Sequence, residues 1–134
     1  MRVLAVNAGS SSLKLRLLDD DTVLRAADLP ADAGGLADAL RGWEKPDAVG
    51  HRIVHGGTDY SGPVRIDDAV RTRLGELTDL APLHQPKSLA ALDAITALLP
   101  GVPAVACFDT AFHADMPPAA STYAIPREWQ ERHG

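Results

Sequence analysis

The sequence predicts an α/β lobe with a mixed β-sheet and flanking helices. The chain opens with three strand-like segments in succession, at 2–8, 12–19 and 22–29. In the second of them, "SLKLRLLD", leucine alternates with polar residues, which is the period of a half-buried strand. Helix and strand patterns then alternate along the rest of the chain. Three opening strands followed by alternating helices and strands indicate an α/β fold with a mixed sheet.

The later elements follow from hydrophobic spacing and from turn residues. We expect a short helix over 36–43, a strand over 47–54, a helix over 67–80, a helix from about Pro86, a strand over 103–108 and a helix beginning at 126–132. Either Asp67 or Asp68 is expected to cap the 67–80 helix. The apolar run at 103–108 suits a central strand covered on both faces. Cys107, the single cysteine, lies in this run and is expected to be buried and inert.

Length, composition and charge limit the class of partner. A chain of 134 residues suggests one domain or one lobe of a larger protein. A net charge of -5 argues against nucleic acid and against anionic membrane surfaces as partners. No apolar run approaches the ~20 residues of a membrane span, and the first residues do not form a signal peptide. We therefore expect a cytoplasmic protein, and a chain that stops as a helix begins suggests a lobe without its remainder.

The stretch "VNAGSSSLK" follows the first strand and brings together groups that suit an anion site. Gly9 permits a positive φ and a close approach of the backbone to a ligand. The backbone N–H groups of such a turn and the serine hydroxyls are donors for phosphate, and Lys14 adds a positive charge. The side-chain oxygen of Asn7 suits Mg²⁺, directly or through water. An ordinary hairpin turn has the same composition, so this stretch alone leaves both interpretations open.

The stretch "GHRIVHGG" places an arginine near the end of a predicted strand. Arg52 there suits a carboxylate or phosphate bound by two parallel hydrogen bonds, and a structural salt bridge is the alternative. His51 and His55 are four residues apart, about 13 Å along a strand, which argues against a shared metal.

Two further stretches, "APLHQP" and "CFDTAFH", carry candidate site residues. In the first, Leu83 is either a core residue or a pocket wall, and His84 is either an anion donor or a hydrogen-bonded loop residue. In the second, Asp109 ends an apolar strand, where side chains line the crevice of α/β sheets. Asp109 is a candidate to hold Mg²⁺ through water, to act as an acid or base, or to cap a helix.

Taken together, "VNAGSSSLK", "GHRIVHGG", "APLHQP" and "FDTAFHADMP" resemble, in this order, the N-terminal motifs of the acetate kinase family of short-chain carboxylate kinases. The resemblance implies a reversible, Mg²⁺-dependent transfer of the γ-phosphoryl group of ATP to acetate, giving acetyl phosphate and ADP. It also implies the N-terminal lobe of the actin-like ATPase, ribonuclease H-like fold, with residues 1–134 forming that lobe and the C-terminal lobe absent. Family members form homodimers through the other lobe, so the resemblance leaves the oligomeric state of this chain open.

The resemblance also assigns roles to individual residues. Asn7 matches the Mg²⁺-associated asparagine, and the phosphate loop is matched by Gly9, Ser10, Ser12 and Lys14. Arg52 matches the arginine that binds the carboxylate and the phosphoryl group, and Asp109 matches the essential aspartate. Val54 and Leu83 match the walls of the methyl pocket, next to His84. A carboxylic acid has a pKa of about 4, so acetate is already ionised near pH 7 and needs no base. We therefore expect Asp109 to orient Mg²⁺, its waters or Arg52.

Three departures from the family pattern stand out. Gln85 replaces the asparagine of "APLHNP", the segment between Asp19 and Asp47 is shorter than usual, and the next family motif, "GFHGTSH", is absent from the 134 residues. We therefore expect the chain alone to bind ATP poorly and to be inactive. Two alternatives remain: a propionate kinase, since one methylene in an apolar pocket is worth only ~1–3 kcal/mol, or a non-catalytic remnant that binds an anion or a protein.

Overall fold

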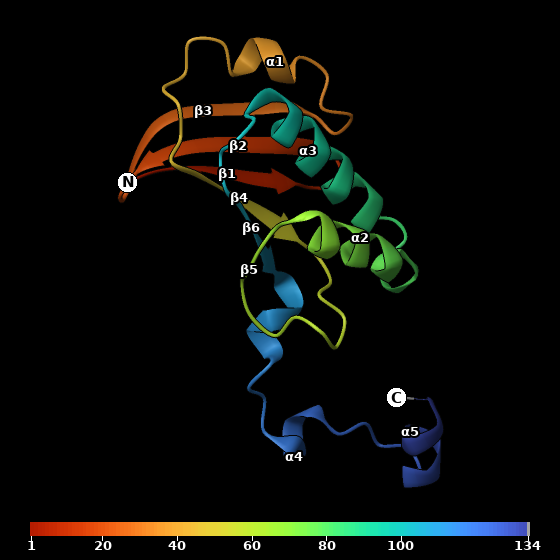
Figure 1. The fold of residues 1–134 in the computed structure, drawn as a ribbon. Coiled ribbons are helices and arrows are strands. Elements are labelled where there is room, and N and C mark those ends of the chain that lie inside the picture. Colours follow the sequence, from red (N-terminus) through yellow and green to blue (C-terminus); the bar gives the residue numbers. More distant parts are fainter. Residues whose placement is uncertain (134) are drawn as a thin grey trace.

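A six-stranded sheet forms the centre of the lobe (Figure 1). The computed structural model describes residues 1–133. The strands are β1 (Arg2–Ala8), β2 (Ser12–Asp19), β3 (Thr22–Pro30), β4 (Ala48–Ile53), β5 (Val64–Arg65) and β6 (Ala104–Phe108). The helices are α1 (Leu36–Ala39), α2 (Asp68–Glu76), α3 (Gln85–Leu98), α4 (Pro118–Ser121) and α5 (Arg127–His133), with 3₁₀ turns η1 (Leu77–Leu80) and η2 (Asp109–His113).

The sheet is mixed, as the sequence predicts, and its strand order is β3-β2-β1-β4-β6-β5. Strands β1, β2 and β3 form an antiparallel meander. Strands β1, β4 and β6 are parallel to one another, and β5 pairs antiparallel with β6 at the edge. Two expectations need correction: β5 has only two residues and was missed, and the segment expected to be irregular contains the short helix α4.

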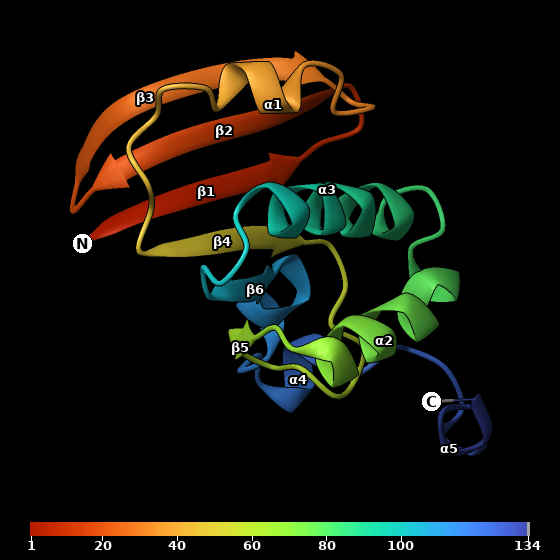
Figure 2. The ribbon, with the colours of Figure 1, turned by 45° about the horizontal axis from the view of Figure 1, so that its top comes forward.

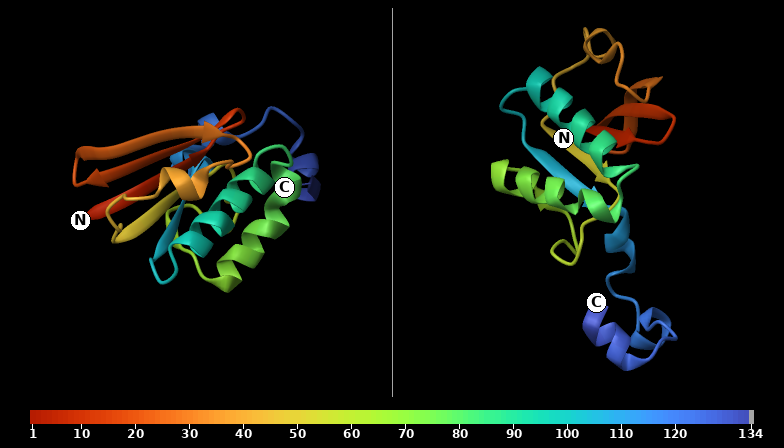
Figure 3. Two further views of the ribbon diagram at one scale, coloured as in Figure 1. Left: turned by 90° about the horizontal axis from the view of Figure 1, so that it is seen from above. Right: turned by 90° about the vertical axis from the view of Figure 1, so that its right-hand side faces the viewer.

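Helices α1, α2 and α3 cover one face of the sheet (Figures 2 and 3). Alternate residues of the strands point to this face and are buried, as the leucines of β2 illustrate. One core cluster joins β1, β2 and β4 to α1 and α3, and a second joins β4 and β6 to α2 and α3. The first cluster consists of Leu4, Val6, Leu13, Leu15, Leu17, Leu36, Val49, Ala91 and Ile95. The second consists of Ile53, Leu74, Leu77, Leu89, Leu92, Ala106 and Phe108.

Two local signals in the sequence fix the starts of α2 and α3. The side chain of Asp67 accepts a hydrogen bond from the backbone N–H of Val70 at 2.8 Å, which caps α2 as expected. Pro86 occupies the first turn of α3, where its missing N–H has no helical partner to lose. The helix expected over 67–80 is divided, because its last turn tightens into the 3₁₀ turn η1.

The opposite face of the sheet carries no helix within residues 1–133. Residues of β1, β4 and β6 that point to it, among them Ala5, Gly50 and Val105, are only partly buried, and Cys107 is exposed. The expectation that 103–108 is covered on both faces, with Cys107 buried, is therefore wrong for this structure. Apolar neighbours in the sequence indicated a central strand correctly, yet they carried no information about which face is covered.

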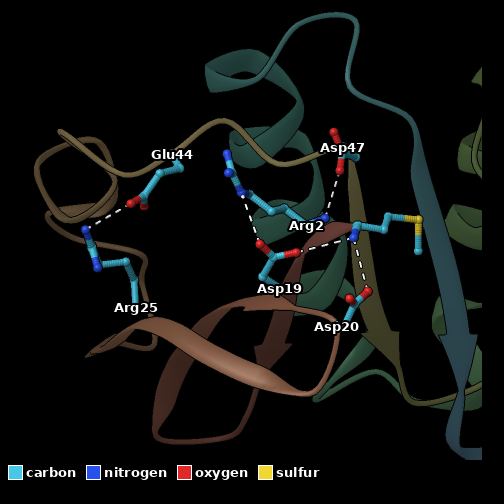
Figure 4. A network of polar contacts seen from close by, with 7 residues as sticks. Arg2, Asp19, Asp20, Arg25, Glu44 and Asp47 are labelled. Carbon is cyan, nitrogen blue, oxygen red and sulfur yellow. Dashed lines mark hydrogen bonds and ion pairs between the residues drawn. The ribbon is translucent and has the colours of Figure 1, made fainter.

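A polar network joins the chain terminus to the strands at the amino end of β1 (Figure 4). The terminal ammonium of Met1 binds the carboxylates of Asp19 and Asp20, at 3.3 and 3.1 Å. The backbone N–H of Arg2 donates to Asp47 just before β4, at 2.8 Å. These contacts fix the start of β1 between the β2–β3 turn and β4, and so support the strand register.

The C-terminal segment leaves the sheet and runs away from it (Figure 1). All residues from 114 to 133 are exposed, including the large apolar side chains of Tyr123 and Trp129. Helix α5 occupies the position where the sequence predicted a helix. Within residues 1–133, the helices are too short or too polar to cross a membrane.

The buried His51 makes the fold sensitive to acid. Its side chain is 1% exposed, and burial lowers its pKa from 6.5 to about 4, although the charge of Asp93 acts in the opposite direction. Between these two pH values the unfolded chain binds a proton that the folded chain does not. The contribution of neutral His51 to the free energy of unfolding is therefore fully present above pH 6.5. We expect the free energy of unfolding to fall by about 3 kcal/mol as the pH decreases to 4.

Urea unfolding of the wild-type chain and of His51→Leu across this pH range measures the effect. The variant should lose most of this pH dependence, whereas His113→Leu, at an exposed position, should keep it. An unchanged pH dependence in His51→Leu would contradict the assignment.

Candidate anion-binding site

Strand pairing places three of the predicted site residues in one row. Asn7 on β1 is paired with Lys14 on β2 and with Arg52 on β4. Directly paired residues point to the same face of a sheet, and this face is the one without helices. The row lies at the carboxyl ends of β1 and β4, where ligands bind in open α/β sheets.

A cleft of about 380 Å³ lies over this row. Its lining consists of Asn7, Gly9, Ser10, Ser11, Ser12, Lys14, Arg52, Val54 and His84. The structure therefore brings together residues of the opening loop and its two flanking strands, of β4 and the loop after it, and of the start of α3. Leu83 is not part of this lining, and its side chain is 76% exposed. Its role as a pocket wall stays a prediction.

Arg52 is held from two sides. Its Nε donates to Asp109 Oδ1 at 2.8 Å, and its Nη2 donates to Asp109 Oδ2 at 2.5 Å. Its Nη1 donates to Asn7 Oδ1 at 3.0 Å. The hydrogen bonds with Asp109 raise the pKa of Arg52 above its ordinary value, so the guanidinium stays charged. These contacts use one hydrogen on each nitrogen, and one hydrogen remains on Nη1 and one on Nη2 for a ligand.

The contacts of Asp109 bear on the alternatives that the sequence left open. The carboxylate orients Arg52, which is one of the roles expected for it. It does not cap the following 3₁₀ turn, which has no side-chain cap. The salt bridge that was the alternative for Arg52 is present, but it lies at the cleft and leaves part of the guanidinium available.

The opening loop is closed by its own backbone. The N–H of Gly9 donates to the carbonyl of Ser12 at 2.9 Å. The expected positive φ at Gly9 is not present, because only Gly35, Gly42, Gly57 and Gly101 among the described glycines have it. Glycine is still favoured there, since a Cβ at Gly9 would lie 3.2 Å from the carbonyl oxygen of Ser12.

The loop after β4 is anchored by residues whose importance the sequence did not indicate. The N–H of Gly56 donates to the hydroxyl of Thr110 at 3.1 Å. Gln85 is fully buried, and its amide donates to the carbonyls of His55 and Leu74, both at 3.2 Å. Gln85, the departure from "APLHNP", thus ties the start of α3 to the loop beyond Arg52 and to α2. Its departure from the family motif and its position in a proline-bounded loop were the signals in the sequence.

The donors in the cleft can be compared with what a divalent cation requires. Within residues 1–133 there is no cluster of three or more His, Cys, Asp or Glu side chains that would hold a metal. The side-chain oxygens at or beside the cleft are those of Asn7 and Asp109, which accept hydrogen bonds from Arg52, and the hydroxyls of Ser10, Ser11 and Ser12. Hard oxygens in small number suit Mg²⁺, which keeps several waters and takes ligands from phosphate. The donor set therefore fits Mg²⁺ that arrives with a phosphate ligand.

Solved structures place the fold among the actin-like ATPases. The lobe superposes on acetate kinase from Porphyromonas gingivalis with a TM-score of 0.81 at 32% identity, covering 99% of this chain and 43% of that one. It superposes on a propionate kinase from Francisella tularensis with a TM-score of 0.79 at 30% identity, covering 98% and 43%. The class that the fold defines is thus the actin-like ATPase fold, and the candidate cleft lies at the carboxyl ends of β1 and β4.

The chain belongs to the acetokinase family, whose model matches residues 36–134. Among curated relatives, the acetate kinase of Thermosipho africanus is 40% identical over 171 aligned positions, covering 99% of this chain and 42% of that protein. The chain thus spans less than half the length of the relatives that it matches. The alignment is longer than the 134 residues of the chain, so the relative has additional residues within the matched region.

The contact between Asp109 and Arg52 generates a prediction about charge at the cleft. Asp109→Asn removes a negative charge beside the anion site, while the half-exposed ion pair contributes only about 0–1 kcal/mol to stability. We expect the affinity for inorganic phosphate at low salt to rise about threefold to tenfold. An NMR titration of the chain with phosphate measures the affinity.

Asp93→Asn is the matched control, because Asp93 forms a similar two-bond pair with Arg71 elsewhere on the lobe. This control should leave phosphate affinity unchanged. Weaker phosphate binding by Asp109→Asn would show that orientation of Arg52 outweighs the charge, contrary to this prediction.

Proposed function

We propose that this chain supplies the carboxylate- and phosphate-binding part of an ATP:acetate phosphotransferase. The observation that carries the proposal is the single cleft in which Lys14, Asn7 and Arg52 stand in register and Asp109 orients the guanidinium. The comparisons support this proposal because the chain belongs to the acetokinase family.

The chemistry requires little more than alignment and charge neutralisation. A carboxylate oxygen of acetate attacks the γ-phosphorus of ATP, a new P–O bond forms, and the bond to the ADP oxygen breaks. No proton is transferred at the attacking oxygen, because acetate is ionised near pH 7. Phosphoryl transfer depends on placing the reactants in line and on balancing charge on the phosphoryl oxygens. Arg52 and Lys14 are the cations of the cleft that provide this balance.

Each predicted residue has a proposed place in this reaction. The two free hydrogens of Arg52 bind the carboxylate and the phosphoryl group. Gly9, Ser10 and Ser12 approach the phosphates through backbone and hydroxyl donors. The remaining residues would contact the organic acid and the metal. Val54 would contact the methyl group and His84 would donate to the carboxylate, both from the lining of the cleft. Leu83 would close the pocket, and Asn7 and Asp109 are the residues that would hold Mg²⁺.

The test joins this chain to the part of the Thermosipho africanus enzyme that lies beyond the matched region. Acetyl phosphate made by the chimera is trapped with hydroxylamine and measured as hydroxamate. We expect formation that depends on both ATP and acetate, and a loss of about 100-fold or more in kcat for Arg52→Ala. The 134-residue chain alone should form none.

The substrates distinguish the two carboxylate kinases. A propionate kinase at 30% identity is among the structural relatives, so propionate is assayed in parallel. A folded chimera that transfers no phosphate, or an Arg52→Ala chimera with full activity, would contradict the proposal. Activity of the verified 134-residue chain would contradict the expectation that it is inactive alone.

The role of Asp109 gives a separate prediction for the chimera. If Asp109 orients Mg²⁺ and Arg52, Asp109→Asn should raise the Mg²⁺ concentration needed for half-maximal rate. The pH profile of kcat should keep its shape, since no proton is taken from acetate. A lost ionisation in the pH profile with unchanged Mg²⁺ dependence would instead establish Asp109 as an acid or base.

A further inference from the structure

A lysine outside the recognised motifs reaches the opening loop from α3. Lys87 lies in the first turn of α3, and its Nζ donates to the backbone carbonyl of Ser10 at 3.3 Å. Its position, between the two prolines of "APLHQP" and the apolar face of α3, gave no reason to assign it to the site. The contact links two walls of the cleft, since Ser10 and His84 both line it.

The backbone beneath Lys87 is fixed. Gln85 and Ser88, on either side of it, are 0% and 2% exposed. The two hydrogen bonds of the Gln85 amide hold this turn against the loop after β4 and against α2. The position from which the Lys87 side chain extends is therefore set by buried contacts, although the side chain itself is exposed.

The contact with Ser10 constrains the next N–H group. The peptide bonds of residues 1–133 are all trans. In a trans peptide the carbonyl and the following N–H lie in one plane and point in opposite directions. When Lys87 holds the carbonyl of Ser10, the N–H of Ser11 points away from Lys87. Ser11 is a lining residue of the cleft, and backbone N–H groups in such turns bind anions.

Lys87 also changes the local charge. Arg52 is balanced by Asp109. Lys14 and Lys87 form no ion pair with any carboxylate of residues 1–133. In a chain with a net charge of -5, these two lysines concentrate positive charge at the loop.

We propose that Lys87 is a positioning residue of the phosphate loop. It holds the peptide between Ser10 and Ser11 so that the Ser11 N–H serves the anion, and its charge favours a condensed phosphate over inorganic phosphate. The proposal rests on the proposed function only for the premise that this loop binds phosphate groups.

The test titrates the ¹⁵N-labelled chain with pyrophosphate and follows both the affinity and the amide shift of Ser11. We expect Lys87→Met to weaken pyrophosphate binding about fivefold and to reduce the shift of the Ser11 amide at saturation. Inorganic phosphate, which carries less charge, should lose less affinity. Lys87→Arg should restore both readouts, because it keeps a charged donor.

Lys45→Met is the matched control, since Lys45 is the remaining lysine and lines no part of this cleft. It should bind pyrophosphate as the wild-type chain does. Thermal melting should be equal in all variants, because Lys87 is exposed.

Wild-type affinity and a wild-type Ser11 shift in Lys87→Met would overturn the proposal. A loss of affinity with an unchanged Ser11 shift would overturn the positioning role and leave a charge effect. If the wild-type chain does not bind pyrophosphate, the proposal fails together with its premise. None of these readouts measures phosphoryl transfer, so an inactive chimera and a failed titration are distinguishable outcomes.

Discussion

The pairing of β1 with two neighbours is the constraint on which the site depends. Antiparallel pairing with β2 and parallel pairing with β4 bring Lys14 and Arg52 to either side of Asn7. The register is strongly specified, because Leu4 and Val6 on the same strand must enter the core. A slip of one residue would reverse the faces and place these polar side chains among the leucines. The core that stabilises the lobe thus also aligns its charged row.

Local charge in the cleft differs in sign from the chain as a whole. The net charge is -5, yet Lys14, Arg52 and Lys87 lie around the opening loop. The carboxylates nearest to them are Asp109, which pairs with Arg52, and Asp28, which is paired with Lys14 across β2 and β3. The proposed attraction of a small anion therefore rests on this local arrangement and not on the overall charge. Asp109 restricts the orientation of Arg52 and at the same time reduces the positive potential. Orientation and charge at this site are therefore adjusted by the same side chain.

Much of the lobe could be predicted from sequence where a pattern repeats over several residues. The alternation in β2, the spacing in α3 and the cap at Asp67 each express a local rule, and the structure agrees with them. The two-residue strand β5 is too short to have a period and exists only through its pairing with β6. At the cleft, the sequence motifs singled out Arg52 and Asp109, which the structure places in contact, whereas they gave no sign of Lys87. Its contact with Ser10 spans 77 positions, and no local pattern reports such a contact.

Cys107 provides an exposed thiol on the face of the sheet that carries no helix. It is the only cysteine of the chain, it is exposed, and it is paired with Arg52 across β4 and β6. A maleimide fluorophore or spin label would therefore attach at one known position without any substitution. The rate of labelling depends on access to the thiol, so polypeptide that covers this face would slow it. Cys107, which the sequence suggested was buried, can thus report through its labelling rate whether other polypeptide covers this face of the sheet.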